Sequence, residues 1–373
     1  MNAGVVRVAV IGGGIAGTFA ACFAARAGAR VTLVERDDIG RHASGRNPGG
    51  LNPLHGPGIP GPLAPLALES LRIHRRCADE GMVSVAPQPK SRLNLVVDDA
   101  TDLEAVHTLE RRYNTTAGFS ATWLSGPELH EREPRLAPSI TKGLLVEGDM
   151  HVEARRYTRA VARAAEARGA TIARTSAVSV VTKGPRVVAV ETASGVLPCD
   201  AVVVATGPWC DAPADWLAVT LPVVPVKGEL LVVEVPGGSV ACDLAWGDVA
   251  VYRLDATRAL IGGTESRVGF DDRCTASARR ALLQGASRIV PSLADAEVVD
   301  HWAALRPVTP DGIPILGLAP GWENVCLALG GGRKGMLFGP AMGMAAVDLL
   351  LEGSTSLPVD ACSPERFAAA RSE

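Results

Sequence analysis

The stretch VAVIGGGIAGTFAACFAARAGARVTLVER, residues 8–36, decides the fold of this 373-residue chain. An apolar, β-branched run over 5–11 predicts a buried strand, and the small-residue segment 18–28, which ends at a glycine, predicts a helix. A second β-branched run over 29–35 predicts the next strand. Strand, helix and strand form a βαβ unit, so the start of the chain is expected to lie in an α/β domain with a parallel sheet.

Three glycines in this unit match G-x-G-x-x-G at the junction of strand and helix. The first allows a tight turn, the second lets a pyrophosphate approach the backbone, and the third lets the helix pack closely on the strand. The N–H groups that begin the helix then face the phosphates. The acid that ends the second strand can bind a ribose diol and disfavours a 2′-phosphate, which makes NADP the least favoured dinucleotide and leaves FAD and NAD. The residues predicted to contact the cofactor here are Gly12, Gly14, Ile15, Ala16, Gly17, Glu35 and Arg36.

Two further glycine-rich segments favour FAD over NAD. They are GRHASGRNPGGLNP (40–53) and ALGGGRKGMLFGP (328–340), almost three hundred residues apart. An NAD domain would continue directly with further βα units, whereas a long cofactor gripped at both ends suits these separate elements. The residues predicted to contact the cofactor in these segments are Ser44, Gly45, Arg46, Asn47, Gly49, Gly332, Arg333, Lys334, Gly335 and Met336.

Composition excludes several other classes of protein. The net charge of −3, with 47% hydrophobic and 21% charged residues, offers no basic surface for nucleic acid. The eight cysteines form no C-x-x-C pair and no zinc-binding spacing, so we expect a reducing, cytoplasmic setting and no metal. No uninterrupted run of 18 apolar residues occurs and no signal peptide is recognisable, so we expect at most a peripheral association with the inner membrane.

The pattern along the rest of the chain predicts a second domain inserted in pieces. Helical spacing occurs at 153–170 and 275–290, antiparallel strands are expected over 221–265, and the chain closes with an apolar helix at 335–353. The dinucleotide-binding half thus comes first and returns last. We predict a discontinuous FAD-binding domain (1–84, 145–214 and 303–373) and a substrate domain (85–144 and 215–302).

The chain resembles the D-amino acid oxidase and glycine oxidase family of FAD-dependent amine oxidoreductases. The motifs, in family order, are the opening βαβ unit, ASGRNPGGLNP (43–53), AVVVATGPW (201–209), YRLDATRALIGGTESRVGFDD (252–272), ALRPVTPDGIPILG (304–317) and LALGGGRKGMLFGPAMG (327–343). The resemblance implies a Rossmann-like FAD domain of the glutathione-reductase type, combined with a substrate domain built on an antiparallel sheet. It adds Val178, Ala205, Gly207 and Trp209 to the expected cofactor contacts.

The resemblance also suggests which residues bind substrate. Arg306 matches the family arginine that pairs with a substrate carboxylate, and a planar guanidinium suits that role because it binds carboxylate with two hydrogen bonds. Tyr252 matches a tyrosine of glycine oxidases whose hydroxyl can hold the same carboxylate. Arg333 is expected to touch substrate or flavin, and Lys334 is expected to place a cation beside the flavin.

Departures from the family leave three hypotheses open. The segment RPVTPDG has no cysteine, which predicts noncovalent FAD. The segment RALIGGTE has no lysine, which leaves O₂ or a quinone or carrier as the electron acceptor. Gly331 replaces a histidine that is frequent in glycine oxidases. The first hypothesis is oxidation of the C–N bond of a small amino acid or secondary amine by hydride transfer, followed by hydrolysis of the imine. The second is a 2-hydroxy-acid dehydrogenase, for which His42, His55 or His301 would be the base. The third is a flavin-binding subunit of a larger complex or the oxidoreductase half of a tRNA-modifying protein. As a partner, we expect a second copy in a homo-oligomer or another subunit of a complex.

Overall fold

The computed structural model describes residues 5–97 and 99–371. Contacts divide the chain into two compact units: unit 1 comprises Met1–Pro87, Val152–Pro225 and Arg306–Glu373, and unit 2 comprises Gln88–His151 and Val226–Leu305. The divisions lie 3, 7, 11 and 3 residues beyond the predicted domain ends at 84, 144, 214 and 302. Each unit has its own sheet, and the assignment of FAD to unit 1 and of substrate to unit 2 stays a prediction.

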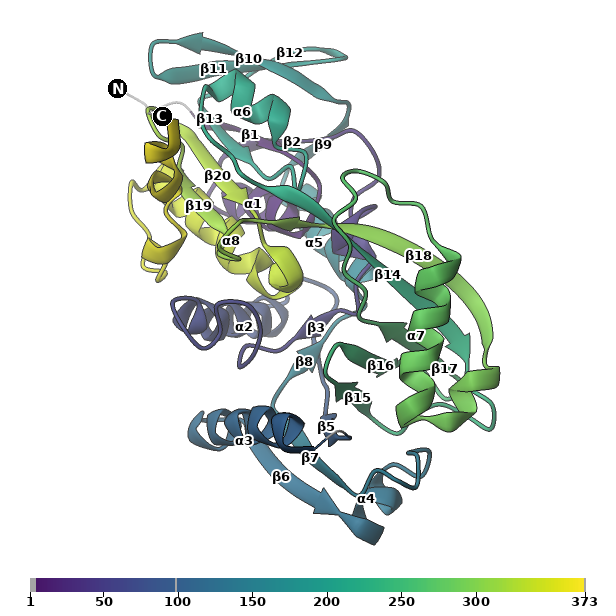
Figure 1. Ribbon diagram of the computed structural model, residues 1–373. Helices are drawn as coiled ribbons and strands as arrows, with labels where there is room; N and C mark the ends of the chain where they lie inside the picture. The colour runs from purple at the N-terminus through teal and green to yellow at the C-terminus, as the bar shows by residue number, and fades with distance from the viewer. Residues whose placement is uncertain (1–4, 98, 372–373) are drawn as a thin grey trace. The chain divides into compact units, whose positions relative to one another are not determined.

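Unit 1 is built on a six-stranded sheet in the order β19-β20-β13-β1-β2-β9 (Figure 1). Its neighbours pair in parallel except for the edge pair β19 and β20, which is antiparallel. The strands are β1 Arg7–Ile11, β2 Arg30–Glu35, β9 Thr171–Arg174, β13 Ala201–Val204, β19 Ile315–Leu318 and β20 Val325–Leu329. The chain enters this sheet first and returns to it last, which confirms the predicted Rossmann-like α/β fold.

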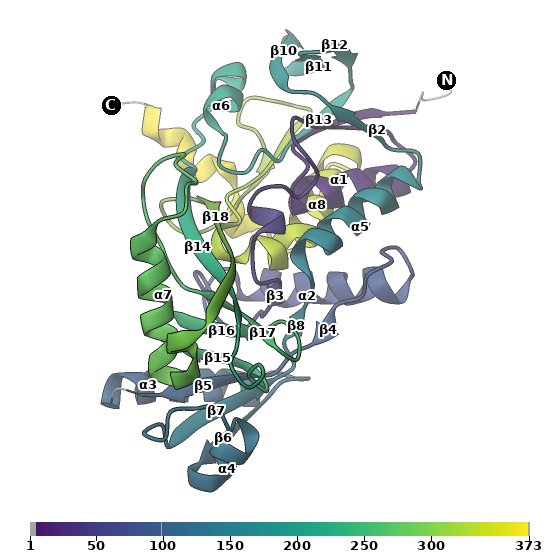
Figure 2. The same cartoon turned by 90° about the vertical axis from the view of Figure 1, so that its right-hand side faces the viewer.

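Four helices of unit 1 pack together: α1 Ile15–Arg26, α2 Ala64–Asp79, α5 Ala154–Glu166 and α8 Gly335–Leu351. Both views show α1 and α8 side by side (Figure 2). Small residues allow this approach, because a Cβ added at Gly343 of α8 would lie 2.6 Å from the main-chain nitrogen of Ala20 in α1. Helix α1 begins at Ile15, three residues before the predicted start, so Gly17 lies inside the helix.

A three-stranded sheet also packs in unit 1. It consists of β10 Ala177–Lys183, β11 Arg186–Thr192 and β12 Gly195–Pro198, and helix α6 Asp211–Leu217 lies against β10. Val187 and Val190 of β11 join Ala9 and Val202 of the main sheet in one buried apolar cluster. The predicted loop over 40–65 contains only a short 3₁₀ turn, η1 Ala43–Gly45, and the two-residue strand β3 Gly50–Leu51.

Unit 2 contains an eight-stranded sheet in the order β18-β14-β17-β16-β15-β5-β7-β6. From β14 to β6 the neighbouring strands pair antiparallel, except that β15 pairs with β5 in parallel. The strands are β5 Arg92–Val96, β6 Ser120–Ser125, β7 Lys142–Glu147, β14 Val224–Glu234, β15 Asp243–Trp246, β16 Val249–Arg253, β17 Arg258–Gly262 and β18 Glu297–Val308. Two short strands of the same unit, β4 Gln88–Pro89 and β8 Met150–His151, pair antiparallel with each other.

Helix α7 Ala276–Ile289 covers one face of the unit 2 sheet. It begins where predicted, since the hydroxyl of Thr275 accepts a hydrogen bond from the Ala278 N–H. Leu282 and Ile289 of α7 join a buried cluster with Val251 of β16. Helices α3 Asp99–Thr115 and α4 Gly126–Arg132 pack near β6 and β7.

The helix over 332–351, which contains α8, is long and apolar enough to cross a membrane by length and composition. However, 61% of that apolar window is buried within the protein. Its surface is used in packing against α1 and α2, as expected for a core helix that is hydrophobic all round.

Candidate active site

The glycine-rich turn between β1 and α1 has a backbone that only glycine fits. Gly12 has φ +110°, and a Cβ there would overlap the main-chain oxygen of Ala205. A Cβ at Gly17 would overlap the main-chain oxygen of Gly12. The turn is therefore closed against the end of β13, and Ala205 is tied to β1 by a 2.8 Å hydrogen bond from its N–H to the Ile11 carbonyl.

The start of α1 is a cradle of backbone donors. Gly14 is the N-cap residue and brings no side chain to the first turn. The Gly13 N–H donates to the carboxylate of Glu35 at 2.6 Å, and the Ile15 N–H donates to the hydroxyl of Ser44 at 3.0 Å. A helix N-terminus without its own side-chain cap, with a carboxylate beside it at the end of the next strand, fits the pyrophosphate and ribose of FAD.

The segment after β2 folds back onto this turn. Gly40 donates from its N–H to the Gly13 carbonyl at 3.0 Å, and a Cβ at Gly45 would overlap the Gly40 oxygen. Asn47 donates to the Ala43 carbonyl at 2.8 Å and accepts from the Gly49 N–H at 2.8 Å. The loop predicted to hold cofactor is therefore ordered by its own side chains and lies at the glycine turn.

Trp209 contacts two nitrogen-bearing side chains, those of Arg36 and His42. The Arg36 guanidinium lies 4.3 Å from the centre of the Trp209 ring, and the His42 ring lies 4.6 Å from it. His42 also contacts the carboxylate of Asp37 at 2.8 Å, and this hydrogen bond lowers the pKa of Asp37. His42 is thus held beside the end of β2 by a hydrogen bond and a ring contact.

The third glycine-rich segment meets the loop at 40–65. The Lys334 ammonium, in the 3₁₀ turn η3 Gly332–Lys334, donates to the main-chain oxygen of Asn52 at 3.1 Å and also to its side-chain oxygen. Because Oδ1 of Asn52 accepts from Lys334, its Nδ2 donates to Nε2 of His55 at 3.0 Å. The two remote segments therefore share one hydrogen-bonded chain.

The glycines before Lys334 are constrained in two ways, by positive φ at Gly330 and Gly332 and by lack of space at Gly330 and Gly331. Gly330 and Gly332 have φ +72° and +54°. Gly331 has φ −64°, which any residue adopts, but a Cβ there would lie 2.8 Å from the Cα of Gly335. A larger side chain at Gly331, such as the histidine expected from the family resemblance, would therefore require this loop to shift.

The two predicted arginines of unit 1 lie at the ends of regular elements. Arg306 is partly buried near the end of β18, and Arg333 is exposed in η3. The turn after Arg306 is fixed by Asp311, which accepts from the Ile313 N–H at 3.0 Å and from the Arg366 guanidinium at 2.8 Å. Asp311 is therefore a structural residue.

Among the other predicted cofactor contacts, Ala16 lies in the first turn of α1, Gly207 has φ +62° next to Trp209, and Met336 is buried at the start of α8. Ile15 turns its side chain into helix packing, since a Cβ at Gly339 would lie 2.6 Å from it. Val178 lies apart, on β10, with 53% of its surface exposed. The structure thus brings the glycine turn, the end of β13 and the loop at 40–49 together, whereas Val178 lies on a separate sheet.

Tyr252 lies in unit 2 on the face of the sheet away from α7. It packs with Trp302 around Leu230 and Leu260, opposite the cluster that contains its neighbour Val251. A Cβ added at Gly262 would lie 3.7 Å from the Tyr252 ring. The ring of Tyr252 therefore belongs to an apolar cluster, to which its hydroxyl adds a polar group.

Sequence reasoning missed Arg92, a largely buried arginine in this unit whose side chain is 12% exposed. Its guanidinium lies 3.7 Å from the carboxylate of Asp149, which accepts at 2.8 Å from the Tyr113 hydroxyl. Burial acts to lower the pKa of Arg92, but Tyr113, Asp149 and Tyr252 raise the pKa above its ordinary value. No motif marks Arg92, because its partners come from distant segments.

A second cluster in unit 2 contains His301. Its Nε2 lies 2.8 Å from the buried carboxylate of Glu229, and Cys274 offers a sulfur within 4.8 Å of both. Such a set could hold a metal ion, but Glu229 already accepts from the N–H and hydroxyl of Thr275 and lies 3.4 Å from the Lys227 ammonium. We interpret the cluster as an ion-pair network that anchors the start of α7.

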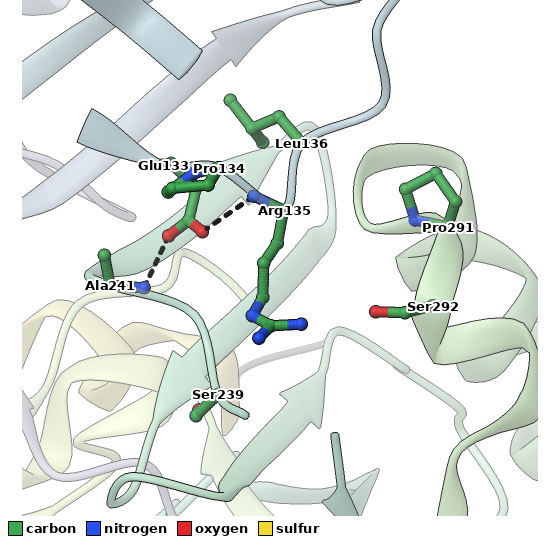
Figure 3. A pocket seen from close by; sticks show the side chains of 8 residues that line it. All are labelled: Glu133, Pro134, Arg135, Leu136, Ser239, Ala241, Pro291 and Ser292. Atoms are coloured by element: carbon green, nitrogen blue, oxygen red, sulfur yellow. Dashed lines mark hydrogen bonds between the residues drawn. The ribbon is translucent and has the colours of Figure 1, made fainter. Parts of the chain in front are cut away.

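A cavity of about 490 Å³ opens in unit 2 (Figure 3). Glu133 lines it, but its carboxylate accepts from the Ala241 N–H at 2.6 Å and the Arg135 N–H at 3.3 Å. The Arg135 guanidinium donates to the carbonyls of Pro236 and Gly237. Burial raises the pKa of Glu133. Because Glu133 and Arg135 form their hydrogen bonds with backbone groups of the surrounding loops, we do not assign the cavity to the substrate.

Comparison with known proteins identifies what these arrangements resemble. A family model described as FAD dependent oxidoreductase matches residues 7–349. The glycine oxidase of Pseudomonas aeruginosa is 32% identical over 92% of this chain and 94% of its own length. The crystal structure of glycine oxidase from Geobacillus kaustophilus superimposes with a TM-score of 0.87 at 28% identity, covering 96% of this chain and 98% of the other. An iminodiacetate oxidase from Chelativorans gives a TM-score of 0.84 at 25% identity, covering 96% and 99%.

Proposed function

The chain belongs to the family of FAD dependent oxidoreductases, and from this premise we propose that it oxidises the C–N bond of glycine or another small amino acid or secondary amine. The observation that carries the proposal is the likeness to a glycine oxidase over nearly the whole of both chains. The glycine turn, the Glu35 carboxylate and the loop at 40–49 fit FAD, as argued above. These residues would hold FAD without a covalent link, and the chemistry it would supply there is the uptake of a hydride from the carbon next to nitrogen.

We assign the substrate carboxylate to Arg306. Arg306 is partly buried near the end of β18, and a planar guanidinium can bind both oxygens of a carboxylate. Its rigid fork then fixes which C–H bond is presented. Orientation of this kind supplies a large part of the rate acceleration, because the substrate loses its translational and rotational entropy on binding and not in the reaction step itself. Tyr252 and Arg333 are assigned as further contacts of the same carboxylate or of the cofactor.

The proton chemistry needs little from the protein. An amine reacts in its neutral form, so the substrate ammonium must first lose one proton, which solvent can accept. The role of Lys334 is electrostatic: it is held by Asn52, and a fixed ammonium stabilises negative charge that develops on a neighbouring ring. The imine formed then leaves and is hydrolysed to an oxo acid and an amine.

A 2-hydroxy acid is the second candidate substrate, because His55 lies in the Lys334–Asn52 chain. Oxidation of a 2-hydroxy acid requires a base that removes the proton of the substrate hydroxyl. Nε2 of His55 already accepts from Asn52, so that nitrogen is not the base in this arrangement. We therefore favour the amine.

The test is anaerobic mixing of the purified yellow protein with glycine, sarcosine, D- and L-amino acids and 2-hydroxy acids. Loss of the flavin absorbance band with amines, and none with hydroxy acids, supports the proposal. Bleaching by hydroxy acids alone would reject it. Re-oxidation with O₂ or with a soluble quinone then identifies the electron acceptor.

A further inference from the structure

Helix α8, which follows the flavin loop, carries a proline inside its second turn. Pro340 has no N–H, so the carbonyl four residues earlier, that of Met336, receives no hydrogen bond from it. Met336 is the second residue of the helix and lies one residue after the loop at 330–335. The helix is therefore weakened at the point where it must hold that loop.

Helix α2 supplies donors at this point. Nε2 of His74 lies 3.0 Å from the Met336 carbonyl and 3.1 Å from the Leu337 carbonyl. The Ser70 hydroxyl donates to the Leu337 carbonyl at 2.6 Å. Ser70 and His74 are fully buried and one helical turn apart, so they present both donors to the same stretch of α8.

The tautomer of His74 follows from its partners. Carbonyl oxygens only accept, so Nε2 carries the hydrogen. Nδ1 then accepts from the hydroxyl of Tyr157 in α5, 2.8 Å away. Burial lowers the pKa of His74 to about 4, which keeps the ring neutral. Tyr157 thus fixes the orientation in which His74 donates towards α8.

We propose that His74 is a positioning residue for the flavin: it replaces the hydrogen bond that Pro340 cannot make and so holds the first turn of α8 and the loop at 330–335 in place. Tyr157 and Ser70 assist it from the two sides. The proposal rests on the assignment of Gly332–Met336 to the flavin. It does not depend on which substrate is oxidised.

The test exploits the fact that Pro340→Ala returns the missing N–H. Four FAD-loaded proteins are compared: wild type, His74→Met, Pro340→Ala and the double variant. Readouts are the FAD dissociation constant, the flavin reduction potential and the unfolding temperature, none of which needs a substrate. His130→Met, which removes a 3.0 Å contact to the Ile140 carbonyl in unit 2, is the matched control with and without Pro340→Ala.

His74→Met should weaken FAD binding about tenfold or more and shift the potential, because a buried carbonyl loses its donor. Adding Pro340→Ala should restore most of that loss, whereas the His130→Met effect should be unchanged by it. Additive losses at His74 and Pro340 would overturn the proposal, and so would a rescue of the unfolding temperature that leaves FAD affinity and potential unaltered.

If His74→Met yields no folded protein, the double variant should fold, and its FAD affinity and flavin reduction potential should approach those of wild type; a double variant that folds but still binds FAD weakly would overturn the proposal. His74→Gln, which keeps a donor, should then resemble wild type in FAD affinity. Failure of both the double variant and His74→Gln would reject the replacement of the missing bond. Failure of the amine hypothesis would show differently, as an intact flavin spectrum that no amine bleaches.

Discussion

The ammonium of Lys334 donates a 3.1 Å hydrogen bond to the main-chain oxygen of Asn52, a residue 282 positions earlier in the chain. This contact joins two glycine-rich segments that are remote in sequence. It also fixes the position of the Lys334 ammonium within a glycine-rich loop. The loops at 40–53 and 328–340 therefore act as one element. A cation so restrained needs no reorganisation when negative charge develops nearby.

Replacing Lys334 with methionine should weaken FAD binding about tenfold and make the flavin harder to reduce, because the cation and its hydrogen bonds to Asn52 are lost. The dissociation constant and the reduction potential measure both effects. Lys183→Met, at an exposed position on β10, is the matched control and should change neither. An unchanged potential in Lys334→Met would place the ammonium away from the flavin ring.

Arg306→Ala should raise the KM for amino acids about tenfold to a hundredfold, since a charge-assisted pair with the carboxylate is lost. Arg306→Lys should recover only part, because an ammonium cannot bind both oxygens in one plane. Steady-state kinetics with an amino acid and with an amine that lacks a carboxylate tests this. An equal loss for both substrates would contradict carboxylate binding.

The free energy of unfolding should fall as the pH is lowered from about 6.5 towards 4, because of His74. Its pKa is about 4 in the folded chain and 6.5 in the unfolded one, so within this range the unfolded chain binds a proton that the folded chain does not. Above 6.5 the stabilisation is fully present, and below that pH it declines by up to about 1.4 kcal/mol per pH unit. Urea unfolding at pH 7.5 and 5 measures it.

The control for this pH dependence is His74→Gln, which keeps a donor but does not titrate. The difference between wild type and this variant isolates His74 from the carboxylates, which titrate in both proteins. Tyr157, whose hydroxyl contacts His74, and Cys77, three residues further along α2, have pKa values raised by burial and stay neutral throughout. Parallel slopes in the two proteins would show that His74 does not titrate as described.

Much of the FAD domain could be predicted because its contacts are local or fall in glycine patterns. The βαβ unit at 8–36 follows from the periodicity of its apolar residues and from its glycines. At Gly12 and Gly17 a Cβ would overlap main-chain oxygens, so glycine is required there. The inserted second unit was also visible, as a change from helical to alternating patterns.

The polar networks could not be predicted, because their partners are distant in sequence. His74 occupies an ordinary helical position, and only the fold brings it to Met336, 262 residues later. Arg92 opens a strand without any motif, and its partner Asp149 comes from another segment. Pro340 was visible in the sequence, but not the donor that compensates for it.

Gly331 offers a test in which space alone decides the outcome. Its φ of −64° suits any residue, yet a Cβ would lie 2.8 Å from the Gly335 Cα, which is backbone and cannot turn aside. Gly331→Ala should therefore destabilise the loaded protein by about 1–3 kcal/mol and weaken FAD binding, and Gly331→His should do so more strongly. Gly335→Ala is the matched control, because a Cβ there meets nothing within 4 Å and φ is −54°. Thermal unfolding and FAD titration of the three variants decide the matter: equal behaviour of the two alanine variants would mean that the loop relaxes freely and that the steric account of Gly331 is wrong.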